Sequence, residues 1–501
     1  MPHTTRRDFL TKTAIAGLGL GLSRSTRGAT TARPQGANDA VRLAVIGMGA
    51  TEAVGGVGGR GHQLLGKLRE VPGARVVALC DVDPTFLERE AKAFRDRGET
   101  VALHQDLRRV CEDPTIDAVV IALPNHWHAL ATIWACQAGK DVYVEKPFSH
   151  DLWEGRQMVA AARKFGRVVQ VGTQNRSSLL LRRVFAELRG GALGRIRFAH
   201  AIMYRPREAI GRVTAPQPPP AGIDYDLWCG PAPKAPLRRK QLHYEWHWFW
   251  DTGNGELGNN GVHMMDLCRW AVGRSDLPKR ALSIGGRFAF DDAAETANTQ
   301  IAYLDFPEVP LICEIRNVRR NRDAAALGSL RGRSRGLIID CEGGYFAGDA
   351  NGGALFDPKG KKIRDLPDDG SARQMEVMHL SNFVAAMRSR KIGELAAEAQ
   401  EGHLSAAGCH LANLSHRLGR QVRPEAIREA VRSQPELADA FERCHEHLRA
   451  NGVDLGATPA TFGPWVTYDA ARHQCVGEFA EAANRMLHRV DRAPFVVPTI
   501  E

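Results

Sequence analysis

One short segment constrains the fold of this chain more than any other. Residues 41–46 read Val-Arg-Leu-Ala-Val-Ile, a nearly continuous apolar run that ends at Gly47. Such a run is typical of a strand buried on both faces of a parallel sheet. A glycine directly after the strand lets the backbone turn sharply. The sequence therefore predicts an α/β fold that opens with a buried parallel strand and a tight turn.

The glycines that follow this strand allow two alignments with a dinucleotide-binding loop. In the first, Gly47 and Gly49 form the turn, and an insertion separates them from a helix that begins near Gly59 and Arg60. The second alignment uses three later glycines, Gly56, Gly58 and Gly61. We prefer the first because Gly47 directly follows the strand, and the helix would offer its free amides to a pyrophosphate. It predicts four cofactor contacts, at Gly47, Gly49, Gly59 and Arg60.

The second strand, expected at residues 75–80, ends in Asp81-Val82-Asp83. An acid at this position accepts hydrogen bonds from ribose hydroxyls and repels a 2′-phosphate, which favours NAD over NADP. The alternative is that Asp81 or Asp83 only caps a helix beginning at Pro84, a role that suits Asp83 well. We predict that Asp81 contacts the ribose.

Two further buried strands are expected at residues 116–123 and 141–145, separated by a helix over 129–138. Because the carboxyl ends of parallel strands meet at one edge of a sheet, the residues after them should converge on the nicotinamide half of the site. These residues are Pro124, Asn125, His128, Glu145 and Lys146. His126 and His128 lack a carboxylate or thiol partner with metal-ligand spacing, so they are expected to orient the turn, and no metal is predicted.

Beyond a helix at 152–164 and a strand at 168–171, strand patterns dominate. They occupy residues 196–203, 281–290, 296–306, 311–318 and 336–341. Few helices separate them, which predicts an α+β domain with a large, open, mostly antiparallel sheet. One face of that sheet would be available to a partner or to the first domain, and we expect a homo-oligomer. The predicted divisions are a signal and linker at 1–38, a Rossmann domain at 39–172, the α+β domain at 173–400, a returning helix at 401–420 and a helical extension at 421–501.

The densest chemistry of the second domain lies in residues 246–251 and 255–266. His263 follows Asn259 by one helical turn, so both side chains could face the same substrate carbon. Alternatively, His263 is a residue at the start of a helix whose ring only forms hydrogen bonds with the backbone. Trp246 and Trp248 alternate at strand spacing and serve either as core or as surfaces on which sugar rings stack. The remaining substrate candidates are Gln174, Arg176, Tyr204 and Asn260.

Three motifs, at 45–49, 123–128 and 144–148, together resemble those of the Gfo/Idh/MocA family of sugar-type oxidoreductases. The resemblance spans roughly residues 41–420 and implies an NAD(P)-binding Rossmann domain, with Lys146 and His263 moving protons during hydride transfer. The usual family pattern places an acid two residues before a glycine and four before the histidine. His263 matches the histidine, but Asn259 occupies the acid position, and an amide cannot accept a proton as a base.

The N-terminal residues resemble a twin-arginine transport signal. Arg6 and Arg7 precede Phe9-Leu10, and a mild apolar run follows over residues 13–22. This predicts a periplasmic or secreted protein that folds around its cofactor before export. Free NAD is scarce outside the cytoplasm, so we expect the cofactor to be bound tightly.

Composition excludes several classes of function. The net charge of +10 falls to +6 without residues 1–40, and the excess is spread along the chain, which argues against nucleic-acid binding. No apolar stretch is long enough to cross a bilayer. The ten cysteines show no CxxC spacing and are expected to be buried free thiols, although spacing alone leaves a disulfide open.

Three functional hypotheses follow. The first is an NAD-dependent oxidoreductase acting on a hydroxyl of a sugar, cyclitol or glycoside. The second is an NAD-dependent glycosidase or lyase that oxidises a hydroxyl transiently and eliminates the neighbouring group. The third is a sugar- or nucleotide-binding protein without catalysis.

Overall fold

Six short parallel strands form the first sheet of the computed structural model, which describes residues 40–49, 58–319 and 327–500. The predicted signal at 1–38 and the glycines at 55 and 56 lie outside these residues. The strands are β1 (Val41–Ile46), β2 (Ala74–Cys80), β3 (Ala102–His104), β4 (Ala118–Ile121), β5 (Asp141–Val144) and β6 (Val169–Val171). Their order is β3-β2-β1-β4-β5-β6, so the chain reverses direction across the sheet between β1 and β4. That switch point is where ligands bind in open α/β sheets.

Helices cover both faces of this sheet, as the continuous apolar runs require. They are α2 (Arg60–Leu68), α3 (Pro84–Arg95), α4 (Leu107–Glu112), α5 (His128–Gln137) and α6 (Leu152–Lys164). Successive side chains of β1 point to opposite faces of the sheet. Ile46 packs with α5 and α6, while Val45 packs with α2 and α3. A later helix, α11 (Met375–Ser389), joins the α2 side through Leu380 and Phe383. The predicted Rossmann domain is therefore confirmed.

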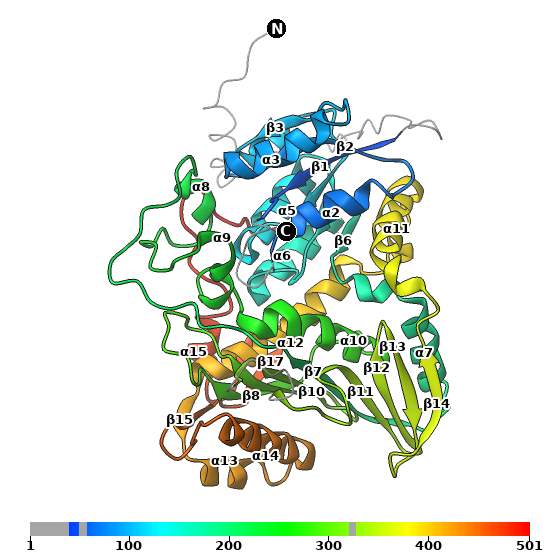
Figure 1. Cartoon of the computed structure of the whole chain (residues 1–501), viewed down its shortest axis with the longest axis vertical. Coiled ribbons are helices and arrows are strands. Elements are labelled where there is room, and N and C mark those ends of the chain that lie inside the picture. The colour runs from blue at the N-terminus through cyan, green and yellow to red at the C-terminus, as the bar shows by residue number, and fades with distance from the viewer. Residues whose placement is uncertain (1–39, 50–57, 320–326, 501) are drawn as a thin grey trace, which may run out of the picture. The chain divides into compact units, whose positions relative to one another are not determined.

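A twelve-stranded sheet forms the second half of the fold (Figure 1). Its strands are β7 (Ile196–Tyr204), β8 (Arg280–Gly286), β9 (Thr299–Asp305), β10 (Leu311–Arg316), β11 (Arg335–Cys341), β12 (Gly344–Asp349), β13 (Gly352–Phe356), β14 (Lys362–Pro367), β15 (Arg420–Val422), β16 (Ala460–Phe462), β17 (Val466–Asp469) and β18 (Gln474–Val476). Among the described strand pairs of this sheet, β7 with β10 is parallel and the others are antiparallel. The large, mostly antiparallel sheet is confirmed.

One face of this sheet packs against α7 (Leu179–Arg189), α10 (Val262–Val272) and α12 (Ala399–Leu418), through residues such as Met203 and Cys313. The opposite face is also covered, by α13 (Pro424–Val431) and α14 (Pro435–Ala450). Figure 1 shows these two helices on the other side of the sheet from α10 and α12. Ile312 and Tyr303 of the sheet pack with Phe441 of α14, and all three are buried.

The expectation of a free sheet face is therefore wrong for the described residues, because the chain covers this face with its own C-terminal helices. The expectation that 421–501 is helical holds for α13, α14 and one short helix near residue 480, but not for the residues between them. The following residues contribute β16 and β17 to the edge of the sheet beside β8, and then the short helix α15 (Ala480–Asn484). The segment after α15 returns to the first domain, where Phe495 packs against Trp127 and Trp134.

All ten cysteines lie in the described part of the chain, and all are free thiols, nine of them buried. This confirms the preferred interpretation of their spacing. Among the described helices, none is both long and apolar enough to span a membrane.

Candidate active site

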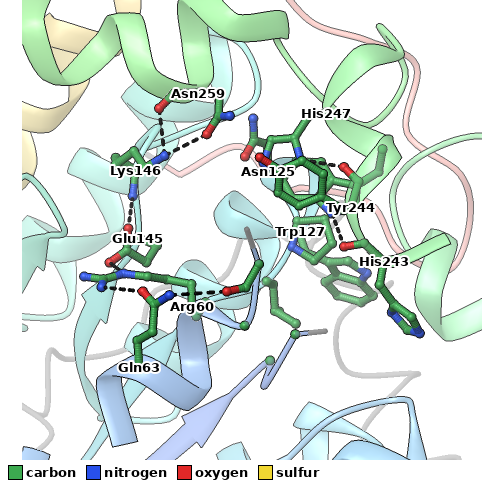
Figure 2. A pocket seen from close by; sticks show the side chains of 18 of the residues that line it. Arg60, Gln63, Asn125, Trp127, Glu145, Lys146, His243, Tyr244, His247 and Asn259 are labelled. Atoms are coloured by element: carbon green, nitrogen blue, oxygen red, sulfur yellow. Dashed lines mark hydrogen bonds and ion pairs between the residues drawn. The ribbon is translucent and has the colours of Figure 1, made fainter. Parts of the chain in front are cut away.

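A cavity of about 450 Å3 opens at the switch point of the first sheet (Figure 2). The ends of β1, β2, β4 and β5 form one side of it. The other side comes from α9 (Leu242–Glu245), the 3-10 turn at Trp246–Trp248, and a π-helical turn at Leu257–Gly261 that leads into α10. Its lining includes Gly47, Gly49, Gly59, Arg60, Asp81, Pro124, Asn125, Glu145, Lys146, Gln174, Trp246, Asn259, Asn260 and His263, all predicted from the sequence.

The turn after β1 requires glycine for steric reasons. Gly47 has φ +88°, and a Cβ there would lie 2.7 Å from the carbonyl oxygen of Ala122. A Cβ on Gly61 would lie only 1.8 Å from the carbonyl oxygen of Gly47, so Gly61 permits α2 to pack closely on the turn. These contacts support the alignment that begins at Gly47, with Gly61 in the role of the third glycine. Gly59 and Arg60 at the start of α2 line the cavity, and a helix N-terminus at this place suits a pyrophosphate.

Arg60, the first residue of α2, links the glycine turn to β5. Its Nε donates a hydrogen bond to Glu145 Oε1 at 2.8 Å, and its guanidinium also pairs with Glu376 of α11. Glu145 thus holds the start of α2 against the strand end that carries Lys146. The cofactor roles predicted for Arg60 and Glu145 remain predictions, but both residues line the cavity.

Asp81 sits at the end of β2 with its carboxylate held in place. Its Oδ2 accepts a hydrogen bond from the Met48 amide at 2.6 Å, and its Oδ1 accepts one from the Asp83 amide at 2.9 Å. Burial raises the pKa of Asp81, and these two amides oppose the shift. Asp83 caps α3, as expected, by accepting from the Thr85 amide. Asp81 faces the cavity where an adenosine ribose would lie in a dinucleotide fold.

Lys146 lies between the two halves of the cavity and makes two hydrogen bonds to one residue. Its Nζ donates to the backbone oxygen of Asn259 at 2.7 Å and to Asn259 Oδ1 at 3.0 Å. Burial lowers the pKa of Lys146 to about 8, although the Glu145 carboxylate opposes the shift. A neutral amine has two N–H donors and one lone pair. With both donors directed to Asn259, the lone pair is left to accept a proton from a bound hydroxyl.

Two histidines stand near this amine. Burial, with the Lys146 charge next, lowers the pKa of His263 well below its ordinary value, and His263 Nδ1 has no partner among the described residues. Burial also lowers the pKa of His247, whose Nδ1 lies 2.7 Å from the carbonyl oxygen of Tyr244. A carbonyl only accepts, so Nδ1 of His247 carries the proton and its Nε2 is an acceptor. Both rings are therefore neutral, and they serve as hydrogen-bonding groups rather than as proton acceptors.

The aromatic segment does not form a strand. Trp246 and Trp248 lie on a 3-10 turn, where Trp246 stacks on His247 with ring centroids 3.6 Å apart. Trp246 lines the cavity, as predicted for a substrate contact, whereas Trp248 packs outside it. The Trp248 indole lies 5.3 Å from the guanidinium carbon of Arg207, and its substrate role remains a prediction.

Three more predicted site residues have buried partners away from the cavity, and their roles remain predictions. His128 is 1% exposed and both its ring nitrogens face carbonyls, of Pro147 at 2.7 Å and Leu123 at 2.8 Å. Arg176 pairs with Asp266 and Glu401, which joins α10 to α12. The Tyr204 hydroxyl donates to Glu314 Oε2 at 2.6 Å. None of the three lines the cavity.

The cavity residues that were not predicted include Arg205, His243, Tyr244, His247 and Arg335. His243, Tyr244 and His247 lie in or next to the aromatic segment that the sequence singled out, so their position offered a signal. The two arginines offered none, because they meet only through the pairing of β7 with β11.

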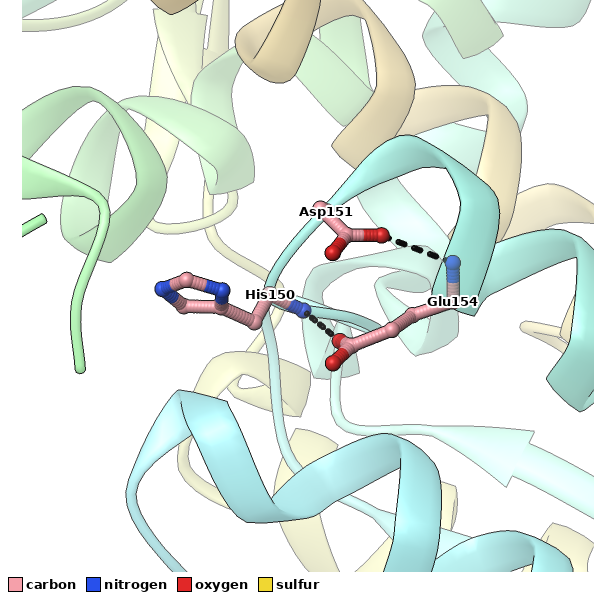
Figure 3. Close-up of side chains that lie close together, drawn as sticks. All are labelled: His150, Asp151 and Glu154. Atoms are coloured by element: carbon pink, nitrogen blue, oxygen red, sulfur yellow. Dashed lines mark hydrogen bonds between the residues drawn. The ribbon is translucent and has the colours of Figure 1, made fainter. Parts of the chain in front are cut away.

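A second polar cluster, formed by His150, Asp151 and Glu154, lies at the start of α6 (Figure 3). Its ligand atoms already have partners. Glu154 pairs with Arg489 at 2.7 Å, His150 Nδ1 lies 3.0 Å from Arg489, and Asp151 contacts His488 at 3.0 Å. An arginine at the centre of the cluster occupies the place a cation would take. The cluster therefore fastens the C-terminal segment to the first domain.

Comparison with known proteins relates these features to a family. Residues 41–173 match a model described as the oxidoreductase family, NAD-binding Rossmann fold, and residues 208–329 match the C-terminal alpha/beta domain of the same family. The chain is 33% identical over 168 residues to inositol 2-dehydrogenase of Acidothermus cellulolyticus, covering 33% of this chain and 46% of that protein. It is 31% identical over 171 residues to a glycosyl hydrolase family 109 protein of Solibacter usitatus, covering 32% and 36%.

The chain thus spans between about a third and a half of the length of the curated relatives it matches. Among solved structures, the WlbA dehydrogenase of Bordetella pertussis, in complex with NADH and UDP-GlcNAcA, aligns over 75% of this chain and 97% of its own, with a TM-score of 0.53 and 18% identity. That likeness concerns the fold. Because both domain models of one family match in order and together cover just over half of the residues, the chain belongs to the Gfo/Idh/MocA oxidoreductase family.

Proposed function

We propose that this protein is an NAD-dependent oxidoreductase that acts on a hydroxyl group of a sugar, a cyclitol or a glycoside. The observation that carries the proposal is the setting of Lys146. Its amine is buried, has a pKa of about 8, donates both hydrogen bonds to Asn259, and lies beside a strand-end cavity lined by the glycine turn. The partial match to inositol 2-dehydrogenase supports the same class of substrate.

The chain's own residues account for binding and for proton transfer. A nicotinamide dinucleotide bound at the glycine turn would supply a two-electron hydride acceptor. Lys146 accepts the proton of the substrate hydroxyl as the C–H hydride leaves, so the alcohol becomes a carbonyl and Lys146 becomes an ammonium. His263, four residues after Asn259 along the helix, has a neutral ring whose Nδ1 lacks a partner among the described residues, so it can hydrogen-bond the substrate oxygen. Trp246 offers an apolar face to the sugar ring.

The cofactor is proposed to be NAD rather than NADP. Asp81 presents a carboxylate where a 2′-phosphate would lie, and no arginine contacts it among the described hydrogen bonds. Tight binding follows from the proposed export of the protein, since a cofactor loaded in the cytoplasm must remain bound outside it. The paired Arg6-Arg7 and the apolar run at 13–22 support that export, and fractionation of cells expressing the full chain tests it.

A redox-neutral reaction is the second candidate. In this scheme the substrate is oxidised transiently, the acidified neighbouring C–H loses its proton, the glycosidic group leaves, and the hydride returns. Asn259 favours it, because the family pattern has an acid there. The match to a glycosyl hydrolase family 109 protein also supports it. A binding protein without catalysis is the remaining alternative, and the intact Lys146 site disfavours it.

One experiment separates these candidates. The purified protein is denatured to identify any released nucleotide, and the intact protein, supplied with NAD⁺, is incubated with sugars and aryl glycosides. Net accumulation of reduced nicotinamide is expected for the oxidoreductase. Released aglycone without net reduction would indicate the redox-neutral reaction. Failure to bind NAD⁺ at all would contradict both.

A further inference from the structure

Two arginines meet at the substrate end of the cavity through the geometry of the second sheet. Arg205 directly follows β7, and Arg335 is the first residue of β11. These strands are antiparallel neighbours in which Arg335 pairs with Met203. The two guanidinium groups, distant in sequence, therefore lie at the same sheet end, and both line the cavity.

Neither arginine has a carboxylate partner among the described residues, unlike the arginines beside them. Arg207 forms a two-point ion pair with Glu256, and Arg316 pairs with Glu314. The contact of Arg205 is a long one, from its Nη1 to Asn260 Oδ1 at 3.5 Å. Burial and the charge of Arg207 lower the pKa of Arg205, although Glu256, which is already paired with Arg207, opposes the shift.

The rest of the cavity wall does not balance these charges. Its two carboxylates, Asp81 and Glu145, are committed at the nucleotide end to backbone amides and to Arg60. The substrate end adds a third cationic group, Lys146. Arg205 is half-buried, and Arg335 is exposed at the start of β11. An uncharged sugar would leave both guanidinium groups without an anion, whereas their planar forks match a carboxylate or a phosphate with paired hydrogen bonds.

We propose that Arg205 and Arg335 bind an anionic substituent of the substrate, so that the substrate is a sugar acid or a sugar phosphate rather than a neutral sugar. The inference rests on the proposed function and names its substrate class. Holding the anion at this end orients the ring across the cavity, with a hydroxyl directed to Lys146. Specificity then depends on residues that lie outside the proton-transfer group.

Calorimetric titration of the full chain supplied with NAD⁺ tests this with matched ligand pairs: glucose and glucuronate, galactose and galacturonate, and glucose with glucose 6-phosphate. We expect an anionic member to bind at least about tenfold more tightly than its neutral counterpart. Preference for a uronate or for the phosphate identifies which anion is recognised. Equal binding within every pair, or no binding of any anion, would overturn the inference.

Variants assign the preference to the two arginines. Arg205→Gln and Arg335→Gln should each reduce the anion-to-neutral affinity ratio about tenfold or more. The matched control Arg238→Gln removes the same charge from an exposed loop outside the cavity and should leave the ratio unchanged. An unchanged ratio in both cavity variants would overturn the assignment.

The same samples are monitored for reduced nicotinamide, which separates this inference from the proposed function. Selective anion binding without cofactor reduction or aglycone release would uphold the arginine site and contradict the reaction. Equal reduction of nicotinamide by neutral and anionic sugars would support the proposed reaction and contradict the arginine site.

Discussion

Replacing Asn259 with aspartate should move the pH dependence of the reaction upward. The new carboxylate would stand about 3 Å from Lys146 Nζ, in place of the amide oxygen that now accepts its hydrogen bond at 3.0 Å. At an effective dielectric constant of about 20, two opposite unit charges at that distance attract by roughly 5 kcal/mol, or about four pKa units. The cost of burying the carboxylate reduces this, and neighbouring charges of this kind typically shift a pKa by about one to three units.

A rise of about two units in the pKa of Lys146 would change the reaction rate strongly. With a pKa of about 8, roughly a quarter of Lys146 is neutral at pH 7.5, whereas with a pKa near 10 only about 0.3% is neutral. Because the neutral amine accepts the proton, kcat/KM for oxidation should rise with pH to a plateau above about 8 in the native protein. In Asn259→Asp the rise should move toward pH 10, with an almost hundredfold lower rate at pH 7.5.

The assay is the initial rate of nicotinamide reduction between pH 6 and 11, with the substrate found by the ligand pairs. Asn351→Asp, which adds the same charge on an exposed turn between β12 and β13, serves as control and should retain the native profile. An inflection that stays near 8 in Asn259→Asp, or that moves down, would refute the assignment of Lys146 as the base.

Four other perturbations have definite expected outcomes. Lys146→Met should lower kcat by about 10²- to 10⁴-fold while NAD⁺ binding persists, whereas the exposed Lys164→Met should not. Asp81→Ser should reduce the ratio of NAD⁺ to NADP⁺ affinity about tenfold in equilibrium titrations. Phe441→Ala, which cuts a buried contact between α14 and the sheet, should cost about 3 to 5 kcal/mol and promote self-association, measured by thermal melting and light scattering. Burial lowers the pKa of His488, but its carboxylate partners Asp151 and Asp491 outweigh burial and raise this pKa to about 9. The shift corresponds to roughly 3 kcal/mol of stability that is fully present below pH 6.5 and is lost as pH rises through 9. The native melting temperature should therefore fall between pH 7 and 10 more than that of His488→Gln.

The sequence was informative where local patterns carry the geometry. The buried strands read as continuous apolar runs that end in glycine or in acids, so the turn at Gly47, the end of β2 at Asp81 and the end of β5 at Lys146 could all be located. Because parallel strands place their carboxyl ends together, these positions also predicted which residues share a cavity. The spacing of Asn259 and His263 is also a local pattern, because residues four apart lie on one side of a helix. It correctly predicted that both would line the cavity.

Residues whose partners lie far along the chain could not be assigned. Tyr204 and Arg176 looked like pocket residues, but Glu314 and Asp266 hold them in the core. The pairing of Arg205 with Arg335 depends on the register of β7 and β11, which no local pattern encodes. Likewise, the sequence indicated a helical extension after residue 420 but not that α13 and α14 would pack on the sheet.

Because α13 and α14 cover one face of the second sheet, this face is not available for contact with another copy of the chain. The homo-oligomer predicted through an open sheet would need a different surface, because α13 and α14 bury Ile312 and its neighbours within one chain. The oligomeric state therefore remains a prediction, to be measured by light scattering of the native protein.

The account's central claim is that hydride leaves a hydroxyl-bearing carbon of the substrate for a nicotinamide held beside Lys146. Its most direct test uses an anionic sugar deuterated at its ring carbons, mixed in a single turnover with protein loaded with NAD⁺, followed by mass analysis of the nicotinamide. We predict that the reduced nicotinamide carries one deuterium from the sugar. In the redox-neutral reaction the labelled nicotinamide is a transient species, which forms before the hydride returns to the substrate. Formation of product with an unlabelled nicotinamide throughout the turnover would contradict the claim.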